Sequence, residues 1–204
     1  MLNRRASMLA VCAIVLAVAI AHADTASLTV DVGRPGAKIS PDLYGIFFEE
    51  INHAGDGGIY AELVRNRSFE DAQSPAGWEE VKRGSAEGKI ALDTDRPLNP
   101  ENPHSLRVEI TKAEQGIFGI ANGGYWGIAV AEGARYQLSF YARADNAFRA
   151  KLNVRLEDAS NKTLAETTVG PPTSEWKRYE CALTARGTDP SARLVLSASA
   201  PGTI

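Results

Sequence analysis

ISPDLYGIFFEEINHAGDGGIYAELVRNRSFE, residues 39–70, is the stretch with the clearest structural pattern in the chain. The apolar run at residues 43–48 is short, follows Pro41 and lacks strict alternation, which predicts a strand covered on both faces, as in a parallel sheet. A turn-rich loop follows it. Residues 59–67 then place their apolar side chains on one helical face, and Asp56 precedes them where a helix N-terminus favours negative charge. Strand, polar loop and helix together predict one βα unit.

The amino-acid sequence of this stretch also resembles that of a known family. YGIFFEEINHAGDGGIYAELVRNRSFE, residues 44–70, closely resembles the N-terminal segment of family 51 glycoside hydrolases, the α-L-arabinofuranosidases. The resemblance implies a retaining enzyme with a (β/α)8 barrel and a C-terminal β-sandwich, which removes terminal arabinofuranosyl residues from arabinose-containing plant polysaccharides. It also implies that Glu49, in the family's F-x-E pattern after Tyr44 and Gly45, hydrogen-bonds the sugar hydroxyls.

Glu49 and Glu50 lie at the C-terminal end of the predicted strand, where barrel enzymes place binding and catalytic groups. Adjacent residues of a strand point to opposite faces, so these two cannot form the carboxylate pair, about 5–5.5 Å apart, of a retaining glycosidase. We therefore expect Glu49 to bind sugar and Glu50 to support the loop, with Asn52 as a further substrate contact. A pair of exposed acids at a strand end is the alternative, and His53 fits a backbone-bonded loop residue as well as a substrate contact.

The first 23 residues have the organisation of a secretory signal peptide. Arg4 and Arg5 precede an apolar run at residues 8–21 that is too short to span a bilayer comfortably, and Ala21-His22-Ala23 fits a small-x-small cleavage site. We predict cleavage after Ala23 and a secreted or periplasmic protein without stable membrane insertion. An N-terminal membrane anchor is the alternative.

The net charge indicates which classes of ligand the protein favours, and the cysteine content shows whether it can form a disulfide. Cleavage removes two arginines and no acidic residue, which lowers the net charge from −3 to −5. An acidic surface disfavours nucleic acid and suits a neutral polysaccharide. Removal of Cys12 leaves Cys181 alone, without a disulfide partner and within a strand-like run that predicts a buried, inert thiol. We expect no cofactor and no metal site.

From residue 75 onward the chain reads as β throughout. Apolar residues alternate in several segments, and turns rich in Gly, Pro, Asn and Asp separate them, which predicts a β-sandwich or jelly roll. The predicted strands are residues 78–82, 89–93, 105–111, 118–121, 136–143, 150–157, 163–169, 176–183 and 193–199, with a turn at residues 200–203 before Ile204.

Four segments of this region resemble the galactose-binding-like carbohydrate module that many family 51 enzymes insert after the first barrel unit. They are HSLRVEI, GYWGIAV, YQLSFYAR and WKRYECALTA. Tyr125 and Trp126 lie in its Gly-flanked turn GGYWG. Exposed aromatic rings stack on sugars, so the two residues are candidates for glycan contact, and docking of the module on the barrel is the alternative. Trp78 and Trp176 are predicted to lie in the core of their strands.

The predicted organisation is a signal peptide (1–23), an incomplete barrel segment (24–70) with a first strand at residues 27–32, and a β-sandwich (75–204) that lacks its last strand. A (β/α)8 barrel needs about 250 residues, and no segment matches the family's two catalytic glutamates. We therefore expect a fragment of a longer arabinofuranosidase, inactive by itself. A stand-alone carbohydrate-binding module or a β-sandwich adhesion protein remains the alternative.

Overall fold

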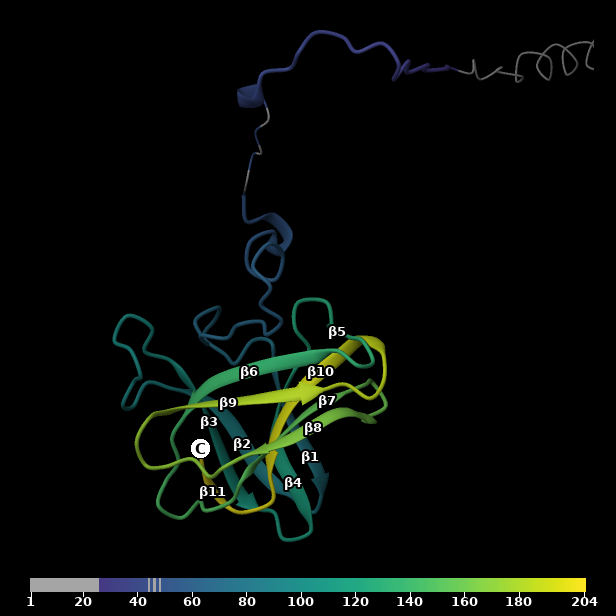
Figure 1. The fold of residues 1–204 in the computed structure, drawn as a ribbon. Helices are drawn as coiled ribbons and strands as arrows, with labels where there is room; N and C mark the ends of the chain where they lie inside the picture. Colours follow the sequence, from purple (N-terminus) through teal and green to yellow (C-terminus); the bar gives the residue numbers. More distant parts are fainter. Residues whose placement is uncertain (1–25, 44, 46, 48) are drawn as a thin grey trace, which may run out of the picture. The chain divides into compact units, whose positions relative to one another are not determined.

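The β-sandwich lies in the second of two structural units, residues 48–204; the first unit is residues 1–47. The computed structural model describes residues 26–43, 45, 47 and 49–204 (Figure 1). The described part of the first unit contains the short 3₁₀ helix η1 (Pro41–Leu43). The predicted signal peptide lies outside the described residues, and among the described ones no helix has the length and apolarity needed to cross a membrane.

The second unit begins with the 3₁₀ helix η2 (Ile51–His53) and continues as β-structure. Its strands are β1 (Trp78–Gly84), β2 (Glu87–Asp93), β3 (Ser105–Lys112), β4 (Gly116–Asn122), β5 (Ile128–Val130), β6 (Arg135–Ala142), β7 (Leu152–Glu157), β8 (Thr163–Val169), β9 (Lys177–Thr184), β10 (Asp189–Ala198) and β11 (Gly202–Thr203).

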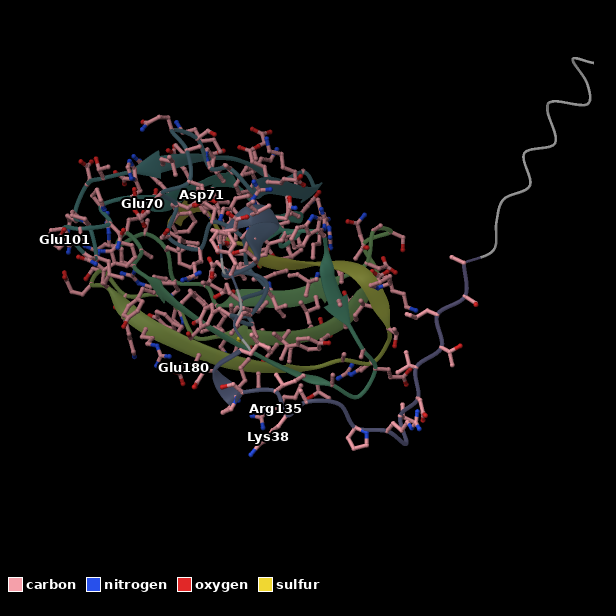
Figure 2. The ribbon with its side chains drawn as sticks, turned by 90° about the horizontal axis from the view of Figure 1, so that it is seen from above. Lys38, Glu70, Asp71, Glu101, Arg135 and Glu180 are labelled. Atoms are coloured by element: carbon pink, nitrogen blue, oxygen red, sulfur yellow. The ribbon has the colours of Figure 1, made fainter. Side chains whose placement is uncertain are left out.

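The strands form three antiparallel sheets. The large sheet has the order β1-β4-β10-β7-β8, with β5 paired to the start of β10. The two smaller sheets are β11-β3-β2 and β6-β9. In Figure 1, β6 and β9 lie across β10 and β7, and Figure 2 shows Arg135 of β6 and Glu180 of β9 pointing outward from this layer.

Apolar side chains fill the space between the large sheet and the smaller ones. One cluster joins Val154, Leu156 and Leu194 of the large sheet to Tyr179 and Leu183 of β9. A second joins β3 and β4 around Phe118 and Phe148, which are both fully buried. Because both smaller sheets cover the same face of the large sheet, this face is the hydrophobic core of the sandwich.

The predicted β-sandwich is confirmed, and each of the nine predicted strands overlaps an observed one. The sequence pattern missed β5 and β11. Gly202 and Thr203, predicted as a turn, instead pair with Ile110 and Glu109 of β3, and Ile204 exchanges both backbone hydrogen bonds with Val108. Gly202 has a φ of 137° and its Cα lies so close to Phe148 that a Cβ would approach it to 2.8 Å, so a larger residue does not fit there.

The predicted βα unit is not observed. Residues 59–67 form turns instead of a helix, with Asn66 in the left-handed region at φ 50°. Leu43 ends η1, Gly45 and Phe47 belong to no strand, and residues 44, 46 and 48 lie outside the described residues. Residues 27–32 also form no strand in their described part. An amphipathic helix or a buried strand gains most of its stability from tertiary packing, and the apolar residues Ile59, Tyr60 and Leu63 are exposed here.

The buried Asn122 attaches residues 61–77 to the sandwich, and the buried Asn66 closes a loop within that segment. The Asn122 side chain, at the end of β4, accepts hydrogen bonds from the backbone N–H groups of Arg65 and Gly124 and donates to the carbonyls of Arg65 and Gly77, at 2.9–3.2 Å. Asn66 donates to the Ala76 carbonyl. All four bonding positions of the Asn122 amide are used, which accounts for its complete burial.

We predict that Asn122→Ala lowers the free energy of unfolding by about 2–3 kcal/mol, because it leaves several backbone groups without partners. Chemical denaturation of the purified chain measures this change. Asn146→Ala is the matched control, since Asn146 is exposed and should change stability by less than about 0.5 kcal/mol. Equal stability of the two variants would contradict the assigned role.

Candidate functional site

The segment that carries the predicted sugar-binding residues forms a closed loop. The Glu50 carboxylate accepts hydrogen bonds from the backbone N–H groups of Gly55 at 2.8 Å and Asp56 at 3.3 Å. Glu49 and Asn52 are exposed, and Asn52 has a left-handed φ of 53°. The structure thus brings Glu50 into contact with the loop, whereas the sugar-binding roles of Glu49 and Asn52 stay predictions.

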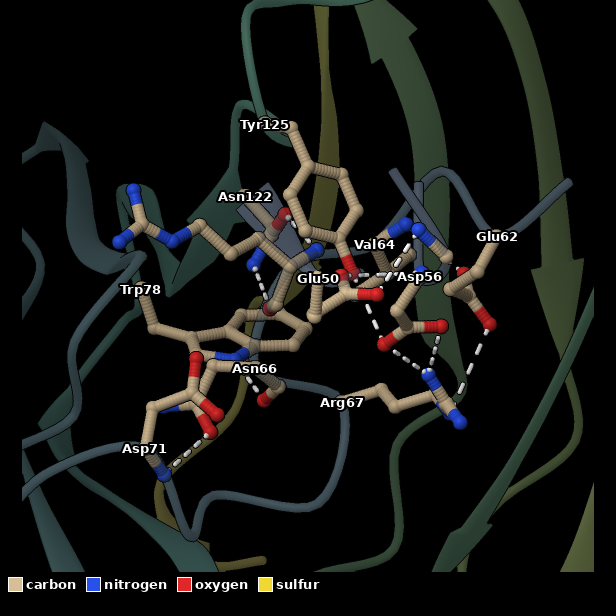
Figure 3. Close-up of polar contacts among 12 residues, drawn as sticks. Glu50, Asp56, Glu62, Val64, Asn66, Arg67, Asp71, Trp78, Asn122 and Tyr125 are labelled. Carbon is tan, nitrogen blue, oxygen red and sulfur yellow. Dashed lines mark hydrogen bonds and ion pairs between the residues drawn. The ribbon is translucent and has the colours of Figure 1, made fainter. Parts of the chain in front are cut away.

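An ion pair and a tyrosine attach this loop to the sandwich (Figure 3). Arg67 Nη1 donates to both carboxylate oxygens of Asp56, at 2.5 and 2.7 Å, and the Tyr125 hydroxyl donates to Asp56 Oδ2 at 3.0 Å. The Glu62 carboxylate lies 3.9 Å from Arg67 Nε. Asp56 therefore joins the loop before the predicted helix to the β4–β5 loop, 69 residues further along the chain.

The two candidate aromatic residues of the β4–β5 loop have different surroundings. Tyr125 is half-buried beneath the His53 ring, with 4.6 Å between the ring centroids, whereas 67% of Trp126 is exposed. The centroids of His53 and Trp126 are 5.6 Å apart. Tyr125 is thus engaged in packing against the N-terminal loop, and Trp126 presents apolar surface to solvent.

A cavity of about 430 Å³ lies elsewhere on the sandwich, between the sheet β11-β3-β2 and the segments that follow β6 and precede β9. Its walls combine an aromatic ring with charged groups of both signs. It is lined by Asp93, Asp95, Arg96, Ser105, Leu106, Arg107, Arg143, Ala144, Asp145, Trp176, Thr203 and Ile204. None of the residues singled out from the sequence as candidates for sugar contact lines this cavity.

The aromatic wall of the cavity is held in place from two sides. Trp176 Nε1 donates to the Arg96 carbonyl at 2.8 Å, and the Arg143 guanidinium lies 5.3 Å from the ring centroid, within the range of a cation–π contact. Arg143 Nη2 also donates to the Asp95 carbonyl, and it lies 4.0 Å from the Asp93 carboxylate. The ring orientation is therefore set before any ligand arrives.

Two carboxylates of the cavity differ in the number of hydrogen bonds that they accept from the protein. Asp145 accepts hydrogen bonds from the backbone N–H groups of Ala147, Phe148 and Thr203. These bonds hold its pKa below the usual value despite the opposing effect of burial. Asp145 thus fixes the loop between β6 and β7, whereas no hydrogen bond or ion pair among the described residues engages the Asp95 carboxylate.

Sequence reasoning missed this site because it assigned Trp176 to the core. Trp176 is half-buried and belongs to none of the three core clusters, and the same holds for Trp78, whose Nε1 donates to the Asn66 carbonyl. The position of Trp176 directly before β9, after the turn residues Pro171 and Pro172, was the available signal. Cys181 is a free, half-buried cysteine, and burial raises the pKa of its thiol.

We predict that Tyr125 titrates well above the ordinary tyrosine pKa of about 10. Burial, followed by the hydrogen bond to Asp56 and its negative charge, raises the pKa of Tyr125 to about 12. Because the folded state favours the protonated phenol, this contribution to stability is complete below the ordinary pKa of about 10 and is lost as the pH rises through 12.

Ultraviolet difference titration of the six-tyrosine chain, with Tyr125→Phe to assign the signal, measures this pKa. Asp56→Asn should move it toward 10 because the negative charge is removed. A Tyr125 that ionises near the ordinary value of about 10 in the unaltered protein would show that the Asp56 contact does not persist in solution.

Comparison with known proteins identifies the family. Residues 61–202 match the family described as carbohydrate binding domain. Over 191 residues the chain is 36% identical to α-L-arabinofuranosidase 1 of Arabidopsis thaliana. This alignment covers 87% of this chain and 28% of the relative. Over an alignment of 205 residues it is 37% identical to an extracellular exo-α-L-arabinofuranosidase of Streptomyces chartreusis. This alignment covers 95% of this chain and 23% of the relative.

A solved structure, the arabinose-bound MgGH51 α-L-arabinofuranosidase, superposes with a TM-score of 0.68 at 31% identity. The match covers 78% of this chain and 27% of the solved one. The chain thus spans about a quarter of the length of these relatives, and the resemblance to α-L-arabinofuranosidases that the sequence indicated is confirmed. With residues 61–202 matched and the β-sandwich observed, the chain belongs to the carbohydrate-binding domain family.

Proposed function

We propose that this chain supplies the carbohydrate-binding part of a secreted, retaining α-L-arabinofuranosidase that removes terminal arabinofuranosyl residues from the non-reducing ends of arabinose-containing plant polysaccharides. The identities of 36% and 37% with named arabinofuranosidases support the reaction class. The name of the Streptomyces relative, which includes the word extracellular, supports secretion after cleavage at Ala23. Residues 24–70 then belong to the catalytic part, and residues 75–204 to the binding module.

The observation that carries the binding function is the cavity beside Trp176. Carbohydrate-binding sites need an apolar surface for the sugar C–H groups together with convergent polar groups for its hydroxyls. Trp176 offers the flat apolar surface, and Arg107 and Asp95 offer a donor and an acceptor at the same opening. A volume of about 430 Å³ lies in the range of small-molecule sites, so the cavity has room for a short oligosaccharide.

The polar groups of the cavity suit neutral sugars. It is lined by three arginines and three aspartates, so its charges balance. Sugar hydroxyls donate to carboxylates and accept from guanidinium groups, and hydrogen bonds to charged groups each contribute about 1.5–3 kcal/mol. Since Trp176 and Arg143 are fixed by existing contacts, a ligand loses little affinity to their ordering.

Two groups of residues remain candidates at the N-terminal side of the module. Glu49 and Asn52 are proposed to contact the arabinofuranosyl group in the complete enzyme, with Glu50 supporting them through the loop. Trp126 is proposed as a glycan or domain contact, because most of its ring is exposed. Tyr125 is proposed to hold the two regions together through Asp56.

We predict that Trp176→Ala weakens binding of arabinoxylan or arabinan oligosaccharides by about tenfold, because a rigid aromatic anchor is removed from the cavity. Isothermal titration calorimetry with the purified chain measures the affinity. Tyr141→Ala is the matched control and should retain most of the affinity, because Tyr141 is an exposed aromatic residue that does not line the cavity. Loss of binding in Trp126→Ala, with Trp176→Ala unchanged, would move the site to the β4–β5 loop.

We predict that the chain does not release arabinose from an aryl arabinofuranoside. Retaining hydrolysis needs two carboxylates about 5–5.5 Å apart, and the adjacent residues Glu49 and Glu50 do not supply them. Arabinose release by the purified chain, freed of contaminating enzymes, would refute the prediction and require a search for a catalytic pair among its own acids.

A further inference from the structure

One residue of the cavity wall has a backbone conformation that its residue type rarely adopts. Arg96, in the loop between β2 and β3, has a φ of 58°, in the left-handed region that favours glycine. Among the described non-glycine residues with a positive φ, it is the one that lines the cavity beside Trp176. It also precedes Pro97, and a residue before proline favours extended backbone with a φ of about −120°. Backbone strain of this kind persists only where surrounding contacts maintain it.

Hydrogen bonds to two successive carbonyl groups maintain this conformation. The Asp95 carbonyl accepts a hydrogen bond from Arg143 Nη2 at 2.8 Å, and the Arg96 carbonyl accepts one from Trp176 Nε1, also at 2.8 Å. The two donor residues contact each other, since the Arg143 guanidinium lies 5.3 Å from the centroid of the Trp176 ring. Both carbonyls are therefore directed to one pair of contacting residues, and this pair also lines the cavity.

The backbone of Arg96 decides whether both hydrogen bonds can form at once. Peptide units are planar, so the direction of the Asp95 carbonyl relative to the Arg96 carbonyl depends on the dihedral angles of Arg96. In extended backbone, successive carbonyls point to opposite sides of the chain. An extended Arg96 would therefore keep one of the two hydrogen bonds and lose the other. Because an indole has a single donor, loss of the bond to Arg96 would leave Trp176 Nε1 without its partner.

The Arg96 side chain adds a second link to the same part of the chain. Its Nη2 atom donates to Glu175 Oε2 at 2.9 Å, and Glu175 directly precedes Trp176. The side chains of Arg96 and Glu175 are 55% and 76% exposed, so water and salt screen this ion pair and it contributes little. Glu175 itself does not line the cavity. The backbone of Arg96, rather than its charge, is thus the stronger link to Trp176.

We propose that Arg96 is a positioning residue of the cavity: its left-handed backbone directs two successive carbonyls to Arg143 and Trp176, and thereby holds the indole ring in the orientation that receives a sugar. The inference rests on the proposed carbohydrate-binding function and deepens it, because it names the residue that prepares the aromatic wall. Arg96 acts through Trp176, so its effect on the ligand depends on its backbone and not on its guanidinium group. A ring that is ordered before binding loses less affinity to ordering than a mobile one.

Two substitutions of Arg96 separate the effect of its backbone from that of its side chain. Arg96→Gly and Arg96→Val both remove the guanidinium group, but glycine adopts a positive φ freely, whereas a β-branched residue strongly disfavours it. Calorimetric titration with an arabinoxylan oligosaccharide should give an affinity within about twofold of the unaltered chain for Arg96→Gly, and an affinity about five- to tenfold weaker for Arg96→Val. Glu175→Gln is the control and should change the affinity by less than about twofold. Thermal melting shows whether each variant is folded, and Arg96→Ala, whose Cβ also disfavours a positive φ, is used if Arg96→Val is unfolded.

The hydrogen exchange rate of the Trp176 Nε1–H group, followed by NMR, reports the hydrogen bond of the ring without any ligand. Trp176→Phe assigns the signal. Exchange should be slow in the unaltered chain and in Arg96→Gly, and at least about tenfold faster in Arg96→Val, because the bond to the Arg96 carbonyl is lost. Trp78, whose Nε1 donates to the Asn66 carbonyl, should exchange slowly in every variant, and the exposed Trp126 should exchange fast in every variant.

The possible results distinguish this inference from the proposed function. Equal losses of affinity in Arg96→Gly and Arg96→Val would make Arg96 a ligand contact and overturn its positioning role, as would an unchanged exchange rate of Trp176 in Arg96→Val. A larger loss of affinity in Glu175→Gln than in Arg96→Val would assign the ring position to the ion pair, which also overturns the proposal. Faster exchange of Trp176 in Arg96→Val, in a protein that binds no oligosaccharide, would support the positioning of the ring and refute the proposed function.

Discussion

Burial of one face of the large sheet is the constraint on which the rest of this structure depends. Apolar side chains of β4, β7 and β10 point to that face, and both smaller sheets pack on it. β10 pairs with β4, β5 and β7 and so connects the strands that carry most of the core. Since side chains alternate along a strand, the same strands must direct Arg155, Glu157 and Arg193 to the opposite face.

The candidate binding cavity follows from this arrangement. The cavity beside Trp176 collects residues from β2, β3 and β11, which form one of the smaller sheets, and from the segments that directly follow β6 and precede β9. The arginine cluster forms on the outer face of the large sheet, where three strands bring like charges together around one buried carboxylate. The cavity has balanced charge and an aromatic wall, whereas the arginines of the outer face surround and neutralise Glu157.

The N-terminal part of the second unit is held by polar contacts to the sandwich. Asn122 and Tyr125, from the end of β4 and the loop after it, bind Arg65 and Asp56. His104 adds a contact directly before β3, where its backbone N–H donates to Glu70 Oε1 at 3.0 Å and its Nδ1 lies 2.6 Å from Glu70 Oε2. The backbone hydrogen bond and then the side-chain contact lower the pKa of Glu70. A depressed carboxylate pKa contributes stability above its unfolded value, and this contribution is lost as the pH falls through the folded pKa.

The sequence by itself determined the β-sandwich, the family resemblance and most strand positions, because period-two alternation and turn residues are local signals. It did not reveal β5 or β11, which are three and two residues long, or the place of Trp176 beside Arg143 and Asp95. The predicted helix at residues 59–67 was wrong because an amphipathic pattern forms a stable helix only where a partner covers its apolar face. Which side chains share a cavity, and which arginines surround Glu157, depends on contacts between strands distant in sequence, and only the tertiary structure decides those.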